Sequence, residues 1–261
     1  MTLSQTMAEP SVPAMPSPNP PALAAGAQAA LNEAVRTQGF ARLRPAETRA
    51  LLGLPDAALA DFAASWDRLE IDDFMADGGR YRRRRIANFA ALPGDAAHRR
   101  GLHRPHFQAV VHNRLNGGVD RWFAPVEDDV AASPACQALL ALGRGVADAL
   151  QPSRPWFVEM HQFRIEAAAG APGLPTPEGV HHDGVDAVLI AMLDRRNLQG
   201  GETLVAAPDG TQLARFTLDG LLDLTVLDDR RVMHGVTPVE PEDPALPSCR
   251  DVLVLTWRRA G

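Results

Sequence analysis

Six short apolar runs follow one another in the second half of the chain, after Pro155. Clusters of Gly, Pro, Asn and Asp separate these runs, whose sequences are WFVEMHQFRIEA, AVLIAML, ETLVAAP, LLDLTVLDD, VMHGVTPV and DVLVLTWRR. Runs of this length with turn residues between them predict β-strands. Their close spacing favours an all-β sandwich or barrel over a fold in which strands alternate with helices.

The first half of the chain has a different pattern, rich in alanine and with apolar residues at helical spacing. Residues 22–35, 47–54 and 132–151 are predicted helices, and Ser133 is placed to cap the last of them. A short strand is predicted at 39–43, and the later part of 72–93 alternates as a strand does. These patterns predict one mainly β domain with flanking helices, covering residues 23–261. Within it we expect a helical N-terminal region at 23–151 and a double-stranded β-helix, the cupin-like jelly roll, at 152–261.

Residues 1–22 are predicted to be a disordered tail, because proline is dense there and little in the segment is able to form a core. The tail lacks the basic region and apolar core of a secretory signal, and no apolar run of the chain reaches the roughly 18 residues that span a bilayer. The two cysteines, Cys136 and Cys249, lie far apart in the sequence and suggest neither a zinc knuckle nor a disulfide framework. We therefore expect a cytoplasmic protein.

The charge of the chain narrows the choice of partner. The formal net charge is -6 and the isoelectric point is about 5.7. Nucleic acids and anionic membranes attract a positive face, so neither is expected as the main partner. A small-molecule substrate fits the composition better, and the sequence leaves the oligomeric state open, a homodimer included.

The stretch GVHHDGVD, residues 179–186, places two histidines and a carboxylate directly before a predicted strand. In an extended chain the side chains at positions i and i+2 share a face, so His181 and Asp183 are able to bind one ion while His182 points away. A third ligand must come from another segment, and His234 in DDRRVMHGV is the best candidate. Two antiparallel strands of a jelly roll bring such distant positions together.

Two imidazoles and one carboxylate on one side of a metal leave three coordination positions open, which is typical of non-haem Fe(II) oxygenases. A closed structural zinc site needs four protein ligands instead. Arg250 begins the strand RDVLVLTW, and a hairpin return is able to place its guanidinium inside the barrel. A buried guanidinium needs an anionic partner, and the distal carboxylate of 2-oxoglutarate meets that need in a bidentate pair.

With these residues in place, the sequence resembles the Fe(II)/2-oxoglutarate-dependent dioxygenases, and within them the bacterial family that hydroxylates free L-amino acids, typified by the isoleucine hydroxylases. The resemblance covers the second half of the chain well and the first half only loosely. It rests on HQFRI at 161–165, HHDG at 181–184, Asn197 with GGE at 200–202, LLDLTVLDDRRVMHGVTPV at 221–239 and RDVLVLT at 250–256.

The resemblance implies a complete set of roles for these residues. By it, His181, Asp183 and His234 bind Fe(II), and Arg250 anchors 2-oxoglutarate. It also implies that O2 and 2-oxoglutarate are consumed, that succinate and carbon dioxide are released, and that a C–H bond of the substrate is hydroxylated. The favoured substrate is a free aliphatic L-amino acid.

Four further features have competing interpretations. Gln162 and Arg164 share a strand face with Val158 and Met160, and if that face lines the barrel, Gln162 binds 2-oxoglutarate and Arg164 meets a substrate carboxylate. An outward-facing charge is the alternative for Arg164. We interpret the run 82–85, four arginines, as a solvated face, with at most one of them near the substrate. We do not expect a second metal site from the histidines at 103, 106 and 112, because no carboxylate lies at ligand spacing from them.

Three rival functions remain at this point. A dioxygenase of the same chemistry is able to act on a peptide or a carrier-bound residue. A non-catalytic cupin-like binding protein would use the pocket without turnover, although such a protein has no need of an open three-ligand iron site. A zinc hydrolase would keep its activity without oxygen and 2-oxoglutarate, which a dioxygenase does not.

Overall fold

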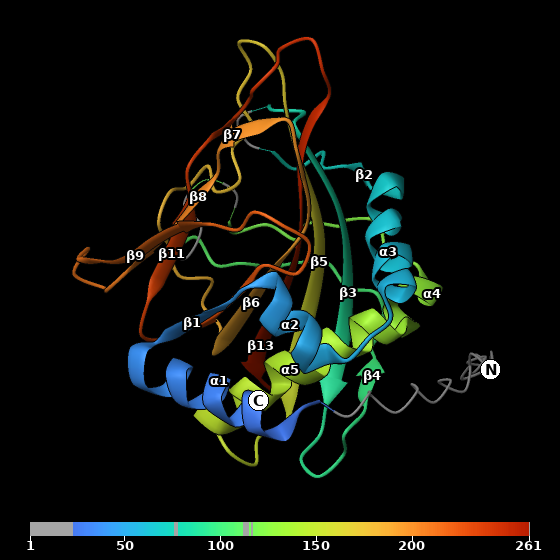
Figure 1. Cartoon of the computed structure of the whole chain (residues 1–261), viewed down its shortest axis with the longest axis vertical. Coiled ribbons are helices and arrows are strands. Elements are labelled where there is room, and N and C mark those ends of the chain that lie inside the picture. Colours follow the sequence, from blue (N-terminus) through green and yellow to red (C-terminus); the bar gives the residue numbers. More distant parts are fainter. Residues whose placement is uncertain (1–22, 76–77, 112–114, 116, 261) are drawn as a thin grey trace, which may run out of the picture.

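Helices and sheets form separate layers in the computed structural model, which describes residues 23–75, 78–111, 115 and 117–260 (Figure 1). The tail predicted at 1–22 lies outside the described residues. The helices are α1 (Ala25–Gln38), α2 (Pro45–Leu52), α3 (Asp56–Ala64), the 3-10 turn η1 (Ser65–Arg68), α4 (Asp128–Ala132) and α5 (Pro134–Leu150). The predicted cap of α5 is confirmed, because the Ser133 hydroxyl accepts a hydrogen bond from the backbone N–H of Cys136.

One large antiparallel sheet and two small ones make up the β structure. The large sheet has the order β1 (Phe40–Leu43), β10 (Leu224–Asp228), β6 (Ala187–Arg196), β13 (Ser248–Arg259), β5 (Trp156–Ala167), β3 (Arg82–Ala91) and β2 (Glu70–Ile71), with β4 (His98–Arg100) paired to β3. The small sheets are β11 (Met233–Val236) with β8 (Glu202–Ala206) and β9 (Gln212–Thr217), and β12 (Val239–Pro241) with β7 (Leu198–Gly200). The prediction of a mainly β jelly roll with flanking helices is confirmed.

The division at residue 151 into a helical region and a jelly roll needs correction. The first half supplies four strands of the large sheet, and β3 pairs with β5 from Arg82 to Ala91. Two of these strands, β1 and β3, lie where the sequence predicts strands, at 39–43 and in the later part of 72–93. The predicted helices of this half are present as well, so the correction concerns only the description of residues 23–151 as a helical region.

The large sheet has apolar side chains on both faces, and each face belongs to a different core. One face packs against the helix layer through α5 and residues such as Met160, Leu189 and Trp257. The opposite face turns toward the small sheets through residues such as Ile190 and Val252. Alternate residues of one strand therefore serve the helix layer and the barrel interior in turn.

The contact between α5 and the sheet is tight enough to require glycine inside a helix. A Cβ atom added at Gly143 would lie 2.0 Å from a ring carbon of Trp257, which is fully buried in β13. Glycine weakens a helix interior by about 1 kcal/mol relative to alanine, so its use here is explained by the indole ring that lies against it.

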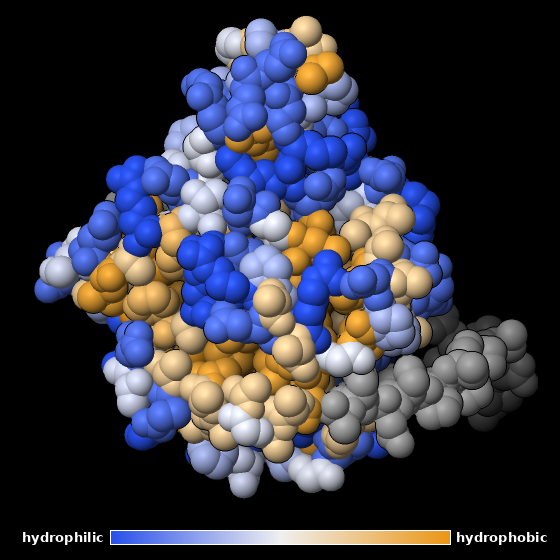
Figure 2. Space-filling view, viewed as in Figure 1, coloured by the Kyte–Doolittle hydropathy of each residue, from blue (hydrophilic) through white to orange (hydrophobic). Residues whose placement is uncertain are grey.

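The helix layer and the loops beyond the sheets differ at the surface. Figure 2 shows apolar side chains gathered over the α1, α2 and α5 region and hydrophilic side chains over the end that carries β7. Among the described residues, none of the helices has the length and apolar character that crossing a membrane would need.

Candidate metal centre

The structure brings together all three side chains that the sequence proposed as metal ligands. His181 and His234 face each other across an antiparallel bridge, in which each backbone N–H donates to the other residue's carbonyl over 2.9 Å. One Asp183 carboxylate oxygen lies 3.4 Å from His181 Nε2, and the other lies 3.6 Å from His234 Nε2. One ligand atom from each residue lies within 4.8 Å of those of the other two, so a single ion is able to contact all three.

The tautomer of His181 suits metal binding. Its Nδ1–H donates to the Gly179 carbonyl over 3.0 Å, which leaves Nε2 directed at Asp183 and, 3.5 Å away, at Glu178. Burial opposes protonation of this ring, but the two carboxylates outweigh it and raise the pKa of His181 to about 9. Burial also opposes ionisation of Asp183, yet the two imidazoles lower its pKa. A cation is therefore favoured between these groups, and a divalent metal would take the place of the imidazole proton.

Asp229 holds the loop that carries two of the three proposed ligands, His181 and Asp183, which we call the ligand loop. Its two carboxylate oxygens accept hydrogen bonds from the backbone N–H groups of Asp183, Gly184 and Val185, at 3.0, 2.8 and 3.0 Å. The ring of His182 bonds to the Asp229 carbonyl and so points away from the centre, as the alternation of an extended chain predicts. We missed Asp229 in the sequence, although its place at the end of the apolar run LLDLTVLDD was a signal.

Arg250 lines the same cavity as the three proposed ligands. The side chain is buried, and its Nε and Nη2 have no hydrogen-bond partner among the described residues. Burial, together with the charge of nearby Arg195, lowers the pKa of Arg250 to about 10. A buried guanidinium without a partner is costly, so the arrangement favours an anionic ligand at this position.

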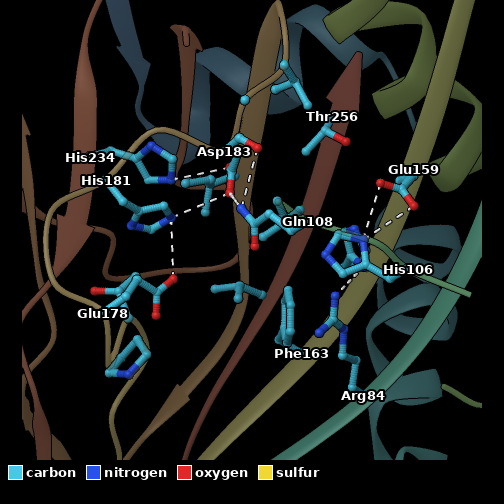
Figure 3. Close-up of a pocket in the computed structure, with 18 of the residues that line it drawn as sticks. Arg84, His106, Gln108, Glu159, Phe163, Glu178, His181, Asp183, His234 and Thr256 are labelled. Atoms are coloured by element: carbon cyan, nitrogen blue, oxygen red, sulfur yellow. Dashed lines mark hydrogen bonds and ion pairs between the residues drawn. The ribbon is translucent and has the colours of Figure 1, made fainter. Parts of the chain in front are cut away.

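The metal centre forms one wall of a cavity of about 310 Å³ in the barrel interior (Figure 3). This volume lies in the range of small-molecule sites. Figure 3 shows His181, Asp183, His234 and Glu178 on one side, Gln108 and Phe163 between, and Arg84, His106 and Glu159 on the other side. Apolar side chains fill in much of the lining, namely Phe157, Ile165, Val185, Ile190, Val236, Val252 and Val254.

The prediction that Gln162 and Arg164 face the barrel is wrong. Gln162 donates to the Ser65 hydroxyl over 2.8 Å on the helix side of the sheet. Arg164 donates to the carboxylates of Asp251 and Asp67, so its guanidinium is occupied. The apolar residues that share their face pack against the helices, whereas the odd-numbered positions of β5 line the pocket.

The interpretation of residues 82–85 as a solvated face is also wrong for two of the four. Arg82 and Arg84 are 6% and 4% exposed and line the pocket. Arg83 points the other way and pairs with Glu166 at 2.8 Å. The run belongs to a strand with alternating faces, and the inward arginines are stabilised by partners that only the fold brings near.

Four pocket residues were not predicted to line the pocket. His106 and Gln108 lie in a loop before α4, and Glu159 and His161 lie on β5. Gln108 is close to the metal centre, with its Nε2 3.5 Å from an Asp183 oxygen. His106, Glu159 and His161 form a second cluster of metal-capable side chains. The carboxylate that the sequence does not show near His106 is therefore Glu159, on the distant strand β5. Position 112 lies outside the described residues.

The jelly roll, with two imidazoles and one carboxylate at the wall of an apolar cavity, defines the class of cupin-type proteins with an open non-haem metal centre. The family model described as 2OG-Fe dioxygenase matches residues 63–256, most of the chain. The chain belongs to this family and is a 2-oxoglutarate-dependent non-haem iron dioxygenase, which uses Fe(II), 2-oxoglutarate and O2.

Individual relatives agree with the family. The chain is 25% identical over 163 residues to 3(1)-hydroxy-L-isoleucine 4-dioxygenase of Pantoea ananatis, which is 61% of this chain and 66%, just under two thirds, of that relative. The crystal structure of a BsmA homologue from Methylobium petroleophilum has 40% sequence identity and a TM-score of 0.82, covering 90% of this chain and 94% of that one. The structure of IDO from Bacillus thuringiensis, at 19% identity and TM-score 0.75, covers 90% of this chain and 100% of that one and shows the fold alone.

Proposed function

We propose that this dioxygenase hydroxylates a small substrate, a free aliphatic L-amino acid, with release of succinate and carbon dioxide. The observation that carries the proposal is the convergence of His181, Asp183 and His234 in a cavity that Arg250 also lines, with its buried Nε and Nη2 unpartnered among the described residues. The relative that acts on a hydroxylated isoleucine supports the amino acid as the class of substrate.

The three ligands fit Fe(II) in donor type and in arrangement. His181 presents Nε2 because its Nδ1–H is held by a carbonyl, and Asp183 is fixed through the loop that Asp229 binds. When bound, the iron supplies the activation of O2 together with oxidation of 2-oxoglutarate. The protein holds the donors in place before the metal arrives, since three of the backbone N–H groups around Asp183 already have a common acceptor.

Arg250 is proposed to bind the distal carboxylate of 2-oxoglutarate. Its buried Nε and Nη2 offer the paired donors that match a carboxylate. The lining of the cavity also includes the apolar side chains of Val236 and Val252, which suit the methylene carbons of the keto acid. Such a site binds the co-substrate in one orientation and excludes water from the bond that forms.

The apolar part of the cavity supports an aliphatic substrate. Its valines, isoleucines and phenylalanines offer few hydrogen bonds to a side chain, so a hydrocarbon is favoured there over a polar group. Both cysteines are free and buried, which supports the expected reducing, cytoplasmic compartment.

The test is a screen for succinate. The protein is incubated with Fe(II), ascorbate, 2-oxoglutarate and each common L-amino acid in turn, and succinate and products are followed by mass spectrometry. We expect succinate above the substrate-free background with an aliphatic amino acid, and a product about 16 mass units heavier, because one oxygen atom is inserted. Turnover only with a peptide or a carrier-bound residue would refute the proposal that the substrate is a free amino acid. Absence of the anaerobic visible band of the Fe(II)–2-oxoglutarate complex in folded protein would favour a binding protein.

A further inference from the structure

The wall opposite the metal centre carries three buried arginines. Arg82, Arg84 and Arg121 are 6%, 4% and 2% exposed, and all three line the cavity. Together with Asp72 and Glu159 they leave this wall with an excess of positive charge. Buried arginines are normally paired, so the excess requires a partner.

The protein provides fewer acceptors here than the arginines can use. One oxygen of Asp72 takes the Nε–H of Arg82 over 2.7 Å, and the other accepts the backbone N–H of Phe74 over 2.9 Å. Arg84 Nη1 is 4.0 Å from the Asp72 carboxylate, beyond hydrogen-bond distance. Among the described residues, Nε of Arg84 and both Nε and Nη2 of Arg121 are buried without a partner. These donors are available to an anion that enters the cavity.

Aromatic rings hold the two arginines in position. The Arg84 guanidinium carbon lies 3.9 Å from the ring centre of Phe123 and 4.5 Å from that of Phe163. That of Arg121 lies 5.8 Å from the same Phe123 ring, so the two cations are neighbours. Their side chains are thus ordered before any ligand binds, and the entropy lost on binding is small.

A carboxylate lies beside this pair of cations. Glu159 is on β5, with the His106 ring nitrogen Nδ1 at 3.3 Å. Burial lowers the pKa of His106 and so favours the neutral form of that ring. The ring therefore donates one hydrogen bond to Glu159 without cancelling its charge. The wall thus presents two cations and one anion a short distance apart.

A second metal ion suits this wall less well, although His106, Glu159 and His161 are near enough to hold one. Arg84 Nη2 donates to His161 Nδ1 over 3.0 Å, and a guanidinium has no acceptor, so that lone pair is taken. The charges of Arg84 and Arg121 also repel a divalent metal ion, which brings no carboxylate of its own to neutralise them. The wall favours an anion with a small positive group next to it.

We propose that Arg84 and Arg121 bind the α-carboxylate of the substrate and that Glu159 binds its α-ammonium group. This inference rests on the proposed function and specifies how a free amino acid is distinguished from a peptide-bound one. In a free α-amino acid the two charged groups are attached to the same carbon, so both must meet the same wall. Glu178 lies on the metal side of the cavity and is not placed for this role (Figure 3). Recognition at the wall opposite the iron directs the hydrocarbon side chain toward the metal.

The first test uses the wild-type protein and substrate analogues. The amino acid that gives most succinate in the screen, with L-isoleucine as the first probe, is compared with its carboxamide and its N-acetyl derivative. Each analogue removes one of the two charges, and we expect kcat/KM to fall about 50-fold or more for both. Equal activity with the free and the derivatised amino acid would overturn the inference.

The second test uses Arg84→Gln, Arg121→Gln and Glu159→Gln, with Arg83→Gln as the matched control on the outer face of the same strand. For the first two we expect KM for the amino acid to rise about 50-fold or more and calorimetric binding of the amino acid to weaken equally. KM for 2-oxoglutarate and the anaerobic Fe(II)–2-oxoglutarate band should stay unchanged. Glu159→Gln should reduce the preference for the amino acid over its α-hydroxy acid analogue. Arg83→Gln should resemble wild type.

The outcomes separate this inference from the proposed function. If no free amino acid gives succinate, the proposed function fails and the inference fails with it. If free amino acids are hydroxylated but the three variants keep wild-type KM values, only the inference is wrong. A tightly bound second equivalent of Mn(II) that Glu159→Gln abolishes would also overturn it. If Arg84→Gln does not fold, the Arg121→Gln and Glu159→Gln variants and the two substrate analogues still test the inference.

Discussion

Asp229→Asn tests whether the ligand loop is prepared before the metal binds. The Asp229 carboxylate accepts three backbone N–H groups from consecutive residues, two on one oxygen and one on the other. Asparagine has nearly the same shape but only one carbonyl oxygen, and its NH2 group would face at least one of the same N–H donors. The substitution therefore removes acceptors without creating a cavity.

The magnitude follows from the number of hydrogen bonds lost. Either one or two of the three N–H groups lose their acceptor, and each buried donor left unsatisfied costs about 1–3 kcal/mol. The remaining bonds weaken because the acceptor is no longer charged. We expect the free energy of unfolding to fall by about 2–4 kcal/mol. Because Asp183 is the first residue of the bound segment, the affinity for metal should fall about 10- to 100-fold, the usual effect of removing an outer-shell partner.

Both quantities are measurable on the same samples. Urea unfolding gives the stability of the metal-free protein, and titration with Mn(II) in the presence of 2-oxoglutarate gives the affinity. Asp228→Asn is the matched control, because among the described residues this neighbouring carboxylate accepts a hydrogen bond from the backbone N–H of Arg230 alone, and asparagine keeps that bond. We expect Asp228→Asn to cost less than about 1 kcal/mol. Wild-type Mn(II) affinity in the Asp229 variant would refute the argument that this side chain positions the ligand loop.

Three further predictions follow from single contacts. Mn(II) with 2-oxoglutarate at about 100 times the Kd should stabilise wild type by about 2.7 kcal/mol, and His234→Ala should abolish the thermal shift; an equal shift in the variant would exclude His234 as a ligand. Burial lowers the pKa of His98 from 6.5 to about 4, so its neutral form stabilises the folded protein fully above pH 6.5. As the pH falls toward 4, up to about 3 kcal/mol of the free energy of unfolding is lost. Urea unfolding at pH 7.5 and 4.5 should show a smaller loss of stability in His98→Asn than in wild type. Gly143→Ala should lower stability by about 1–3 kcal/mol through the clash with Trp257, whereas Gly26→Ala, with nothing near its added Cβ, should not; a stable Gly143 variant would mean that the indole moves freely.

The strands of the second half could be predicted from the sequence because their apolar runs are continuous and bounded by turn residues. The ligand set was accessible for a different reason: alternation in an extended chain already places His181 with Asp183 and turns His182 away. Arg250 was expected inside the barrel because a hairpin return brings the start of its strand there, and in the structure the lining residues of β13 follow it at every second position.

The face of β5 could not be predicted in the same way. Both faces of this strand are buried, one by helices and the other by the cavity, so hydrophobicity does not tell them apart. Assigning the apolar positions to the barrel interior put Gln162 and Arg164 in the pocket and left His161 outside it. On the helix side, Gln162 and Arg164 are satisfied by Ser65, Asp67 and Asp251, which lie far away in the sequence. On the cavity side, β5 carries Glu159 and His161.

The same reasoning explains why the charged wall was invisible in the sequence. Arg84 is tolerated in a buried position only because Phe123, Phe163 and His161 meet it there, and these residues come from two other segments of the chain. A sequence shows the cost of burying such a cation but not the contacts that offset it. Where the fold supplies only part of the compensation, as at the unpartnered Nε of Arg84, the remainder is available to a ligand. In a soluble enzyme core, an incompletely paired arginine facing a cavity is therefore better evidence for a substrate anion than any run of arginines in the sequence.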